Sequence, residues 1–159
     1  MAKLLAHLVV DTCVLQKANA KLSPASPPKE GRLFKIRVNL LKRLSAGEAK
    51  ALYSKRLLAE YGRQIQEPRN EFVAAFLVLL TTGAAELNWQ ALSGAERENL
   101  RRCRYPPEDQ HLLRTGKGKR STIVTEEGRL LKVDNCTHRF FGVHISEPST
   151  VVFPSAREH

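Results

Sequence analysis

Four acidic residues are the side chains of this sequence best suited to chemistry, because each lies beside a predicted strand end or on an adjoining helix. They are Asp11, Glu60, Asp109 and Glu127. Hard divalent cations take oxygen ligands, and Mg²⁺ is usually held by one or two carboxylates together with waters and substrate phosphates. Several carboxylates at one point repel one another unless a cation neutralises them. If the fold brings these acids together, the pattern therefore predicts a metal centre.

Asp11 is the most informative of the four acids, because the apolar run Leu8–Val10 ends at it. Ligands of open α/β sheets collect at the carboxyl ends of the strands, so a carboxylate there is well placed to hold a metal or a polar substrate. A simpler role is open as well, since Asp11 can cap the helix that follows. Glu60, taken alone, also fits an exposed position on a helix.

Two of the acids have an acidic neighbour that competes for the same role. Glu108 precedes Asp109, and both suit the first turn of a helix, where carboxylates face the positive end of the dipole. We favour Asp109 as the inward-facing residue because two leucines follow it at core spacing. Glu126 and Glu127 pose the same choice, which the sequence leaves open.

Short strands that alternate with helices must position these acids. Apolar patterning predicts strands at 1–10, 51–53, 122–124 and 140–145, and a proline- and serine-rich loop at 22–31. Periodicity and capping residues predict helices at 12–20, 32–44, 54–65, 71–81, 93–103 and 106–114, and one capped by Thr125 that ends at Leu131. This order predicts one three-layer α/β/α domain over residues 1–159 with a mostly parallel central sheet.

Charge and composition narrow the class of protein. Lys and Arg number 26 and Asp and Glu number 16, a net charge of +10 that favours a polyanionic partner. No apolar run approaches the length of a membrane span of about 18 residues. The three cysteines, Cys13, Cys103 and Cys136, are far apart, odd in number and without a CxxC pair. They argue against a disulfide framework or a zinc site and predict a reducing, cytoplasmic setting.

Several other active-site classes do not fit the sequence. The basic segment 116–119 lacks the spacing of a phosphate-binding loop and precedes a strand, so a basic turn near bound RNA fits it better. The histidines lack the HExxH spacing of zinc enzymes. Cys13 stands where a dehalogenase-type phosphotransferase has its second aspartate, so that class does not fit. A dinucleotide-binding domain needs a glycine-rich turn after its first strand, and this sequence has none there. The run Arg101–Arg104 fits a solvated helix end.

The order of the acidic segments resembles that of PIN-domain ribonucleases, in particular the prokaryotic toxins of toxin–antitoxin pairs. The segments that carry the resemblance are Val9–Leu15, Leu57–Tyr61 after Ser54, Asp109–Leu113 and Ile123–Leu131, with Gly142–Pro148 similar to the final strand of that branch. The resemblance spans most of the chain. It implies a PIN-like fold, an antitoxin protein as partner and a homodimer.

The resemblance also implies roles for individual residues. Asp11, Glu60, Asp109 and Glu127 are expected to bind Mg²⁺ or Mn²⁺ and to serve as the catalytic acids. Glu127 replaces the aspartate usual in that family, and Cys13 replaces an asparagine. Residues expected to contact the substrate are Thr12, Lys55, Arg56, Thr125, Lys117, Lys119 and Arg120.

The function expected from the sequence is metal-dependent hydrolysis of RNA phosphodiester bonds. The alternative is a catalytically weak or inactive PIN-fold module that binds nucleic acid or a protein. The replacements at Cys13 and Glu127 favour this alternative, and action on DNA is a third possibility.

Overall fold

A single sheet of five parallel strands forms the centre of the protein, as shown by a computed structural model that describes residues 6–21 and 24–153. The strands are β1 (Ala6–Val10), β2 (Ala49–Tyr53), β3 (Glu86–Leu87), β4 (Thr122–Val124) and β5 (His144–Ser146), in the order β3-β2-β1-β4-β5. β1 is therefore central and pairs with both β2 and β4. The first five residues of the strand predicted at 1–10, and residues 22 and 23 of the predicted loop, lie outside the described residues.

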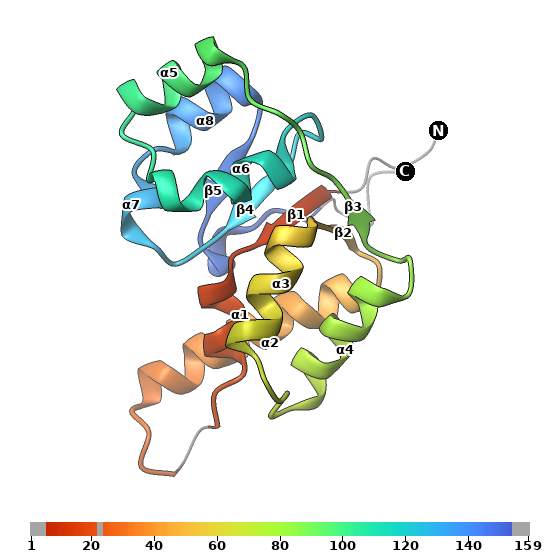
Figure 1. The fold of residues 1–159 in the computed structure, drawn as a ribbon. Helices are drawn as coiled ribbons and strands as arrows, with labels where there is room; N and C mark the ends of the chain where they lie inside the picture. The colour runs from red at the N-terminus through yellow and green to blue at the C-terminus, as the bar shows by residue number, and fades with distance from the viewer. Residues whose placement is uncertain (1–5, 22–23, 154–159) are drawn as a thin grey trace, which may run out of the picture.

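Helices cover both faces of the sheet, so the predicted three-layer α/β/α class is confirmed (Figure 1). The first half of the chain forms α1 (Thr12–Ala18), α2 (Pro28–Ser45), α3 (Lys55–Gln64) and α4 (Glu71–Thr81). The second half forms α5 (Gly94–Arg102), α6 (Gln110–Gly116), α7 (Gly128–Leu131) and α8 (Asp134–Phe141). Short 3₁₀ turns, η1 (Pro107–Asp109) and η2 (Pro148–Thr150), precede α6 and follow β5.

The central strands are apolar because helices bury them from both sides. Leu8, Val9 and Val10 of β1 and Ile123 and Val124 of β4 are all buried in the core. Val10 is in register with Val124, so β1 and β4 end at the same level. The residues that follow these two strands are therefore neighbours at the carboxyl edge of the sheet.

Local capping explains where several helices begin. The Ser54 side chain accepts a hydrogen bond from Leu57 N at 3.2 Å and starts α3 as predicted. Ser93 and Glu96 form the predicted capping box of α5. α6 packs against β1, β2 and β4 and against α3 (Figure 1), and the Thr115 hydroxyl donates a 2.8 Å hydrogen bond to the Ser54 hydroxyl. The two helices that follow β2 and η1 are thereby held side by side.

The structure corrects three boundaries. Residues 140–141, predicted as strand, end α8 instead, because Gly142 adopts the left-handed conformation (φ 67°) that stops a helix. α2 begins at Pro28, inside the predicted loop, since proline suits the first helical turn. Thr125 is not the cap of α7, which begins only after Glu127.

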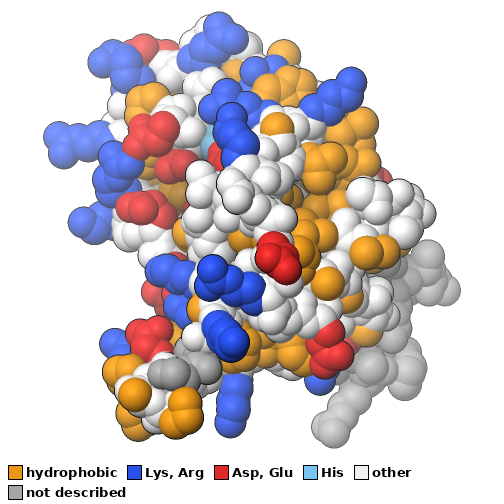
Figure 2. Space-filling view, turned by 60° about the horizontal axis from the view of Figure 1, so that its bottom comes forward, with side chains coloured by type: hydrophobic (Ala, Val, Ile, Leu, Met, Phe, Trp, Pro, Cys, Tyr) orange, Lys and Arg blue, Asp and Glu red, His pale blue; other side chains and the backbone are white. Residues whose placement is uncertain are grey.

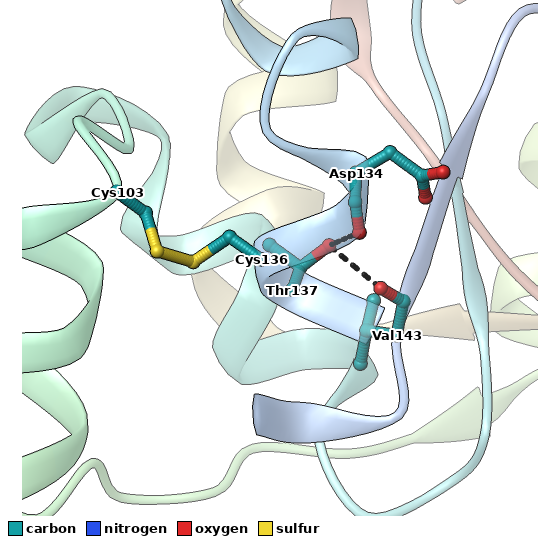
Figure 3. The surroundings of a disulfide bond; sticks show 5 residues. All are labelled: Cys103, Asp134, Cys136, Thr137 and Val143. Carbon is teal, nitrogen blue, oxygen red and sulfur yellow. Dashed lines mark hydrogen bonds between the residues drawn. A yellow bond between two sulfur atoms is a disulfide. The ribbon is translucent and has the colours of Figure 1, made fainter. Parts of the chain in front are cut away.

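A disulfide joins Cys103, at the end of α5, to Cys136 of α8 (Figure 3). The prediction that the cysteines argue against a disulfide is wrong, because the fold brings two cysteines 33 residues apart to a Cα–Cα distance of 6.2 Å. The cysteines therefore no longer support the expectation of a reducing compartment. Beside the bridge, the Thr137 hydroxyl donates to the carbonyl of Val143 at 2.7 Å and connects α8 to the approach to β5.

The surface carries charges of both signs. In the view of Figure 2, basic side chains surround acidic ones over the left half of the face, and apolar side chains gather on the right half. Within residues 6–21 and 24–153, no helix is long and apolar enough to span a membrane.

Candidate functional site

Asp11 directly follows β1 and is held at the carboxyl edge of the sheet. Its backbone N–H donates to Val124 O at 2.9 Å, and its carboxylate accepts hydrogen bonds from the Thr125 hydroxyl at 2.8 Å and the Cys13 thiol at 3.4 Å. The carboxylate does not cap α1, although Asp11 occupies the position before it. Burial raises the pKa of Asp11 above its ordinary value, and the Thr125 hydrogen bond opposes that rise. Thr125 and Cys13 thus hold the Asp11 side chain in place, and it does not cap a helix.

Glu60 reaches the same edge from α3. Its two carboxylate oxygens have different partners: Thr12 Oγ1 donates to Oε1 at 2.5 Å, and His111 Nε2 lies 3.1 Å from Oε2. The next residue, Tyr61, is buried, and its hydroxyl donates to the carbonyl of Val10. This hydrogen bond fixes α3 against the end of β1 and so places Glu60 beside Asp11.

Asp109 comes to the site from the end of η1, immediately before α6. Its carbonyl accepts a 2.7 Å hydrogen bond from the hydroxyl of the buried Tyr105, which fixes the turn. Burial, together with repulsion by Asp11, Glu108 and Glu127, raises the pKa of Asp109 to about 6. Three other acids therefore act on this carboxyl group, as expected where carboxylates converge.

Glu127 is the third residue after β4 and immediately precedes α7. Its N–H donates to Thr125 Oγ1 at 3.0 Å, so one threonine hydroxyl contacts both Asp11 and the backbone of Glu127. The neighbouring Glu126 turns the other way and accepts two 2.7 Å hydrogen bonds from the Arg37 guanidinium on α2. The open choice between the two glutamates is settled in favour of Glu127.

The choice between Glu108 and Asp109 is settled in the same manner. Glu108 is exposed and pairs with Arg129, whereas Asp109 faces the site. All four predicted acids line one open cavity of about 240 Å³, together with Thr12, Cys13, Gln16 and Gln64. Gln16 of α1 and Gln64 of α3 share a 2.8 Å hydrogen bond at its rim. The structure thus collects side chains from four separate segments of the chain into one acidic cavity.

The donor atoms of the cavity suit a hard divalent cation, since they are carboxylate oxygens that repel one another. Within residues 6–21 and 24–153, no three His, Cys, Asp or Glu side chains form a ready metal-binding group. Mg²⁺ retains several waters and needs only one or two carboxylates, so the donor set fits a hydrated ion. Asp11 and Asp109 are the acids whose burial and mutual repulsion such an ion would offset most.

His111 is a site residue that the sequence reasoning missed. Its side chain is buried, and Nδ1 lies 3.1 Å from the carbonyl oxygen of Glu108. A carbonyl only accepts, so Nδ1 carries the hydrogen and Nε2 is left facing Glu60 without a well-aligned hydrogen bond in the described part of the chain. Burial lowers the pKa of His111 and favours its neutral form. The signal in the sequence was a lone histidine two residues after Asp109, just before two core leucines.

Of the basic residues predicted to contact the substrate, only two lie near the acids. Lys55 and Arg56 begin α3, one helical turn before Glu60, and both are exposed. The positive charge of Arg56 helps to lower the pKa of the neighbouring His111.

The structure does not bring Lys117, Lys119 and Arg120 to the acidic cavity. They lie in the turn between α6 and β4, at the amino ends of the strands and hence at the opposite edge of the sheet. Lys117 pairs with Glu96 at 2.7 Å and Lys119 with Glu86 at 3.0 Å. The glycine-rich segment therefore serves as a structural turn, and the charges of Lys117 and Lys119 are engaged within the fold.

Comparison with known proteins gives no match: no protein-family model matches the chain, and none of the curated proteins or solved structures is significantly similar to it.

Proposed function

We propose that this protein is a metal-dependent nuclease that hydrolyses RNA phosphodiester bonds. The observation that carries the proposal is that Asp11, Glu60, Asp109 and Glu127, from separate elements, line one cavity at the carboxyl edge of a parallel sheet. This edge is where open α/β folds bind their ligands. RNA is the substrate class favoured by the PIN-like order of the motifs and by the net charge of +10.

Each side chain has a role in this proposal. Asp11 and Asp109 would hold Mg²⁺ or Mn²⁺, which would neutralise the charge that builds up on the phosphate and assist ionisation of the attacking water. Glu60, oriented by the hydroxyl of Thr12, would accept a hydrogen bond from that water. Glu127 would orient the bound water network from the opposite side, and Thr125 would keep Asp11 in its conformation.

Lys55 and Arg56 would bind the phosphates beside the bond that is cut, since they are exposed and lie one turn before Glu60. An antitoxin protein and a second copy of this chain are part of the proposal only through the resemblance to the toxin branch.

A non-catalytic module that binds nucleic acid or protein is the second candidate, and Cys13 favours it. The Cys13 thiol lies 3.4 Å from Asp11 and 3.7 Å from the Thr125 hydroxyl. Burial and the charge of Asp11 raise the pKa of Cys13 to about 11, so the thiol stays protonated and occupies part of the coordination space of Asp11.

Cleavage of a labelled RNA in Mn²⁺, with and without EDTA, separates these candidates. We expect cleavage that requires Mn²⁺ and that Asp11→Asn reduces to background. Glu48→Gln is the matched control, because Glu48 is exposed, pairs only with Arg43 in the described part of the chain and lies before β2. RNA binding without Mn²⁺-dependent cleavage would instead support the non-catalytic module, and a parallel DNA substrate tests the choice of nucleic acid.

A further inference from the structure

A second, larger cavity of about 640 Å³ lies beside α5 and has not been used by the proposed mechanism. Five basic side chains line it: Arg97, Arg101, Arg104, Arg129 and Lys132. No carboxylate of the described residues lines it, and buried apolar residues, among them Leu100 and Tyr105, form part of its wall. We call this cavity the α5–α7 groove. Its volume is in the range of about 300–1,000 Å³ that is typical of ligand pockets.

Most of the charge in the groove is not neutralised by the protein. Arg101 pairs with Glu98, and Arg129 pairs with Glu108. Arg97, Arg104 and Lys132 have no ion-pair partner within the described ranges, residues 6–21 and 24–153. The five basic residues are exposed, and like charges gathered on one surface repel one another, less strongly as the salt concentration rises. An anion bound in the groove would relieve that repulsion.

The turn that carries Arg104 is firmly held, so the groove is a built feature of the fold. Arg104 has a left-handed backbone (φ 63°), which few residues other than glycine adopt. On one side of it, the Cys103–Cys136 disulfide joins the turn to α8. On the other side, the buried Tyr105 donates its hydroxyl hydrogen bond to the carbonyl of Asp109. The groove is thereby connected to a residue of the acidic cavity.

The groove and the acidic cavity adjoin each other across η1. Pro107 and Gln110, which flank Asp109 in the chain, line the groove. Arg129 also lines it, while its guanidinium pairs with Glu108 and its Nε lies 3.8 Å from Glu127 Oε1. A chain bound at the acids would therefore pass next into the groove.

We propose that the α5–α7 groove binds the phosphates of single-stranded RNA on one side of the bond that the acidic cavity cuts. This inference rests on the proposed function for the identity of the chain at the acids. Guanidinium groups suit the ligand, because they bind phosphate through two hydrogen bonds and stack on unpaired bases. A hollow of this size admits nucleotides of one strand. An acidic peptide offers carboxylates but no bases, and it would meet four protein carboxylates at the adjoining cavity.

The test measures binding of a fluorescein-labelled twelve-nucleotide oligouridylate to the full chain by anisotropy, in EDTA so that no cleavage occurs. The groove variant is Arg97→Gln/Lys132→Gln, and the matched control is Arg102→Gln/Lys35→Gln. Both variants remove two positive charges from exposed helical or helix-end positions, but Arg102 and Lys35 do not line the groove. We expect Kd to rise about tenfold or more in the groove variant at 0.1 M salt. The slope of log Kd against log salt should fall by about 1.4, the value for two lost phosphate contacts to a single strand. The control should change Kd by less than about twofold.

Equal losses in the two variants would overturn the proposal, since binding would then depend on net charge alone. A polyglutamate peptide that binds in a groove-dependent manner, when oligouridylate does not, would also overturn it and would assign the groove to an acidic protein partner. Groove-dependent RNA binding without Mn²⁺-dependent cleavage would support the groove and contradict the proposed nuclease. Mn²⁺-dependent cleavage with an unchanged KM in the groove variant would support the proposed nuclease and contradict the proposed role of the groove.

Discussion

The hydroxyl groups of Thr12 and Thr125 determine how two of the acids are oriented. Thr12 donates to Glu60, 48 residues away, and Thr125 donates to Asp11, 114 residues away. Hydrogen bonds of this kind fix a carboxylate without neutralising it, so the acids keep the charge that a divalent cation requires. Part of the cost of that charge falls on Asp109, whose pKa is raised to about 6.

Asp109→Asn should stabilise the metal-free protein at neutral pH. The folded state raises the pKa of Asp109 from 3.8 to about 6, so ionisation of this residue opposes folding. That penalty is absent below about pH 4 and develops as the pH rises through 6. We expect a gain of up to about 1 kcal/mol at pH 7 in urea unfolding, after allowance for solvent screening of a half-exposed group. The gain should vanish at pH 4, and an equal gain at both pH values would contradict this account.

His111→Leu should reduce Mn²⁺-dependent cleavage while leaving the fold intact. Leucine keeps much of the side-chain volume, but it removes the Nδ1–H that donates to the carbonyl of Glu108, the residue before Asp109, at 3.1 Å. Loss of a group that orients a metal-site residue typically costs about 10- to 100-fold in activity or metal affinity. Measured kcat, KM and Mn²⁺ dependence will show where the loss lies. An unchanged Mn²⁺ dependence would mean that His111 has only a packing role.

Sequence reasoning located all four acids of the cavity because each acid ends or follows a local pattern. It failed for His111, whose role depends on the approach of Glu60 from a segment about 50 residues away in sequence. It also misjudged Lys117 and Lys119, because a run of charges does not reveal which edge of the sheet it occupies. Contacts of that kind are produced by tertiary packing and have no local signature.

At the scale of the elements, an ion pair connects α2 to the turn that carries Glu127. The guanidinium of the buried Arg37 makes two hydrogen bonds of 2.7 Å to Glu126, next to Glu127. This pair lowers the pKa of Glu126 below its ordinary value. The orientation of the turn after β4 therefore depends on a helix from the opposite end of the chain.

Arg37→Met should destabilise the protein by about 2–3 kcal/mol at pH 7, because it leaves the partly buried Glu126 with only Lys17, 3.9 Å away, as an ion-pair partner in the described part of the chain. Arg43→Met is the matched control on the same helix, since Arg43 forms a much more exposed pair with Glu48 and should matter by less than about 1 kcal/mol. The pKa of Glu126 is lowered in the fold, so the difference should shrink as the pH falls below about 4.5. Equal effects of the two substitutions in urea unfolding would contradict this role for Arg37.

Elements with strong periodicity, clear caps or an apolar run between turns were predicted well, whereas β3 and α8 were not. The helix at 71–81 and the strand at 122–124 have the predicted bounds. β3 has only two residues and is held by its pairing with β2, so it has no pattern to detect. Only the last two residues of α8 were predicted as strand, because two aromatic residues precede a glycine whose role as a helix stop depends on its backbone angle.

For the whole molecule, the disulfide should contribute substantially to stability. It closes a loop of 33 residues between two helices on the same side of the fold (Figure 3). The chain-entropy relation for a loop of this length gives about 3–4 kcal/mol. We expect the urea midpoint to fall in dithiothreitol, and the double variant Cys103→Ser/Cys136→Ser to be unaffected by the reductant.

Cys13 lies outside the bridge, so its reactivity serves as a control for the effect of the reductant on Cys103 and Cys136. Burial raises the pKa of its thiol to about 11, so it should react slowly with iodoacetamide at neutral pH in the native protein. A midpoint that does not change on reduction would show that the Cys103–Cys136 bridge contributes nothing to the free energy of unfolding.

The pairing of β1 with β4 has a consequence for the time course of folding. β1 is the first described strand, yet one of its two neighbours lies more than 110 residues further along the chain. Pairings so distant in sequence must overcome a large entropy of loop closure and form slowly. During synthesis, Asp11 emerges early, and the edge of β1 that pairs with β4 stays unpaired until β4 has left the ribosome. The acids therefore meet only after most of the polypeptide has been made, so a truncated chain would lack this constellation altogether.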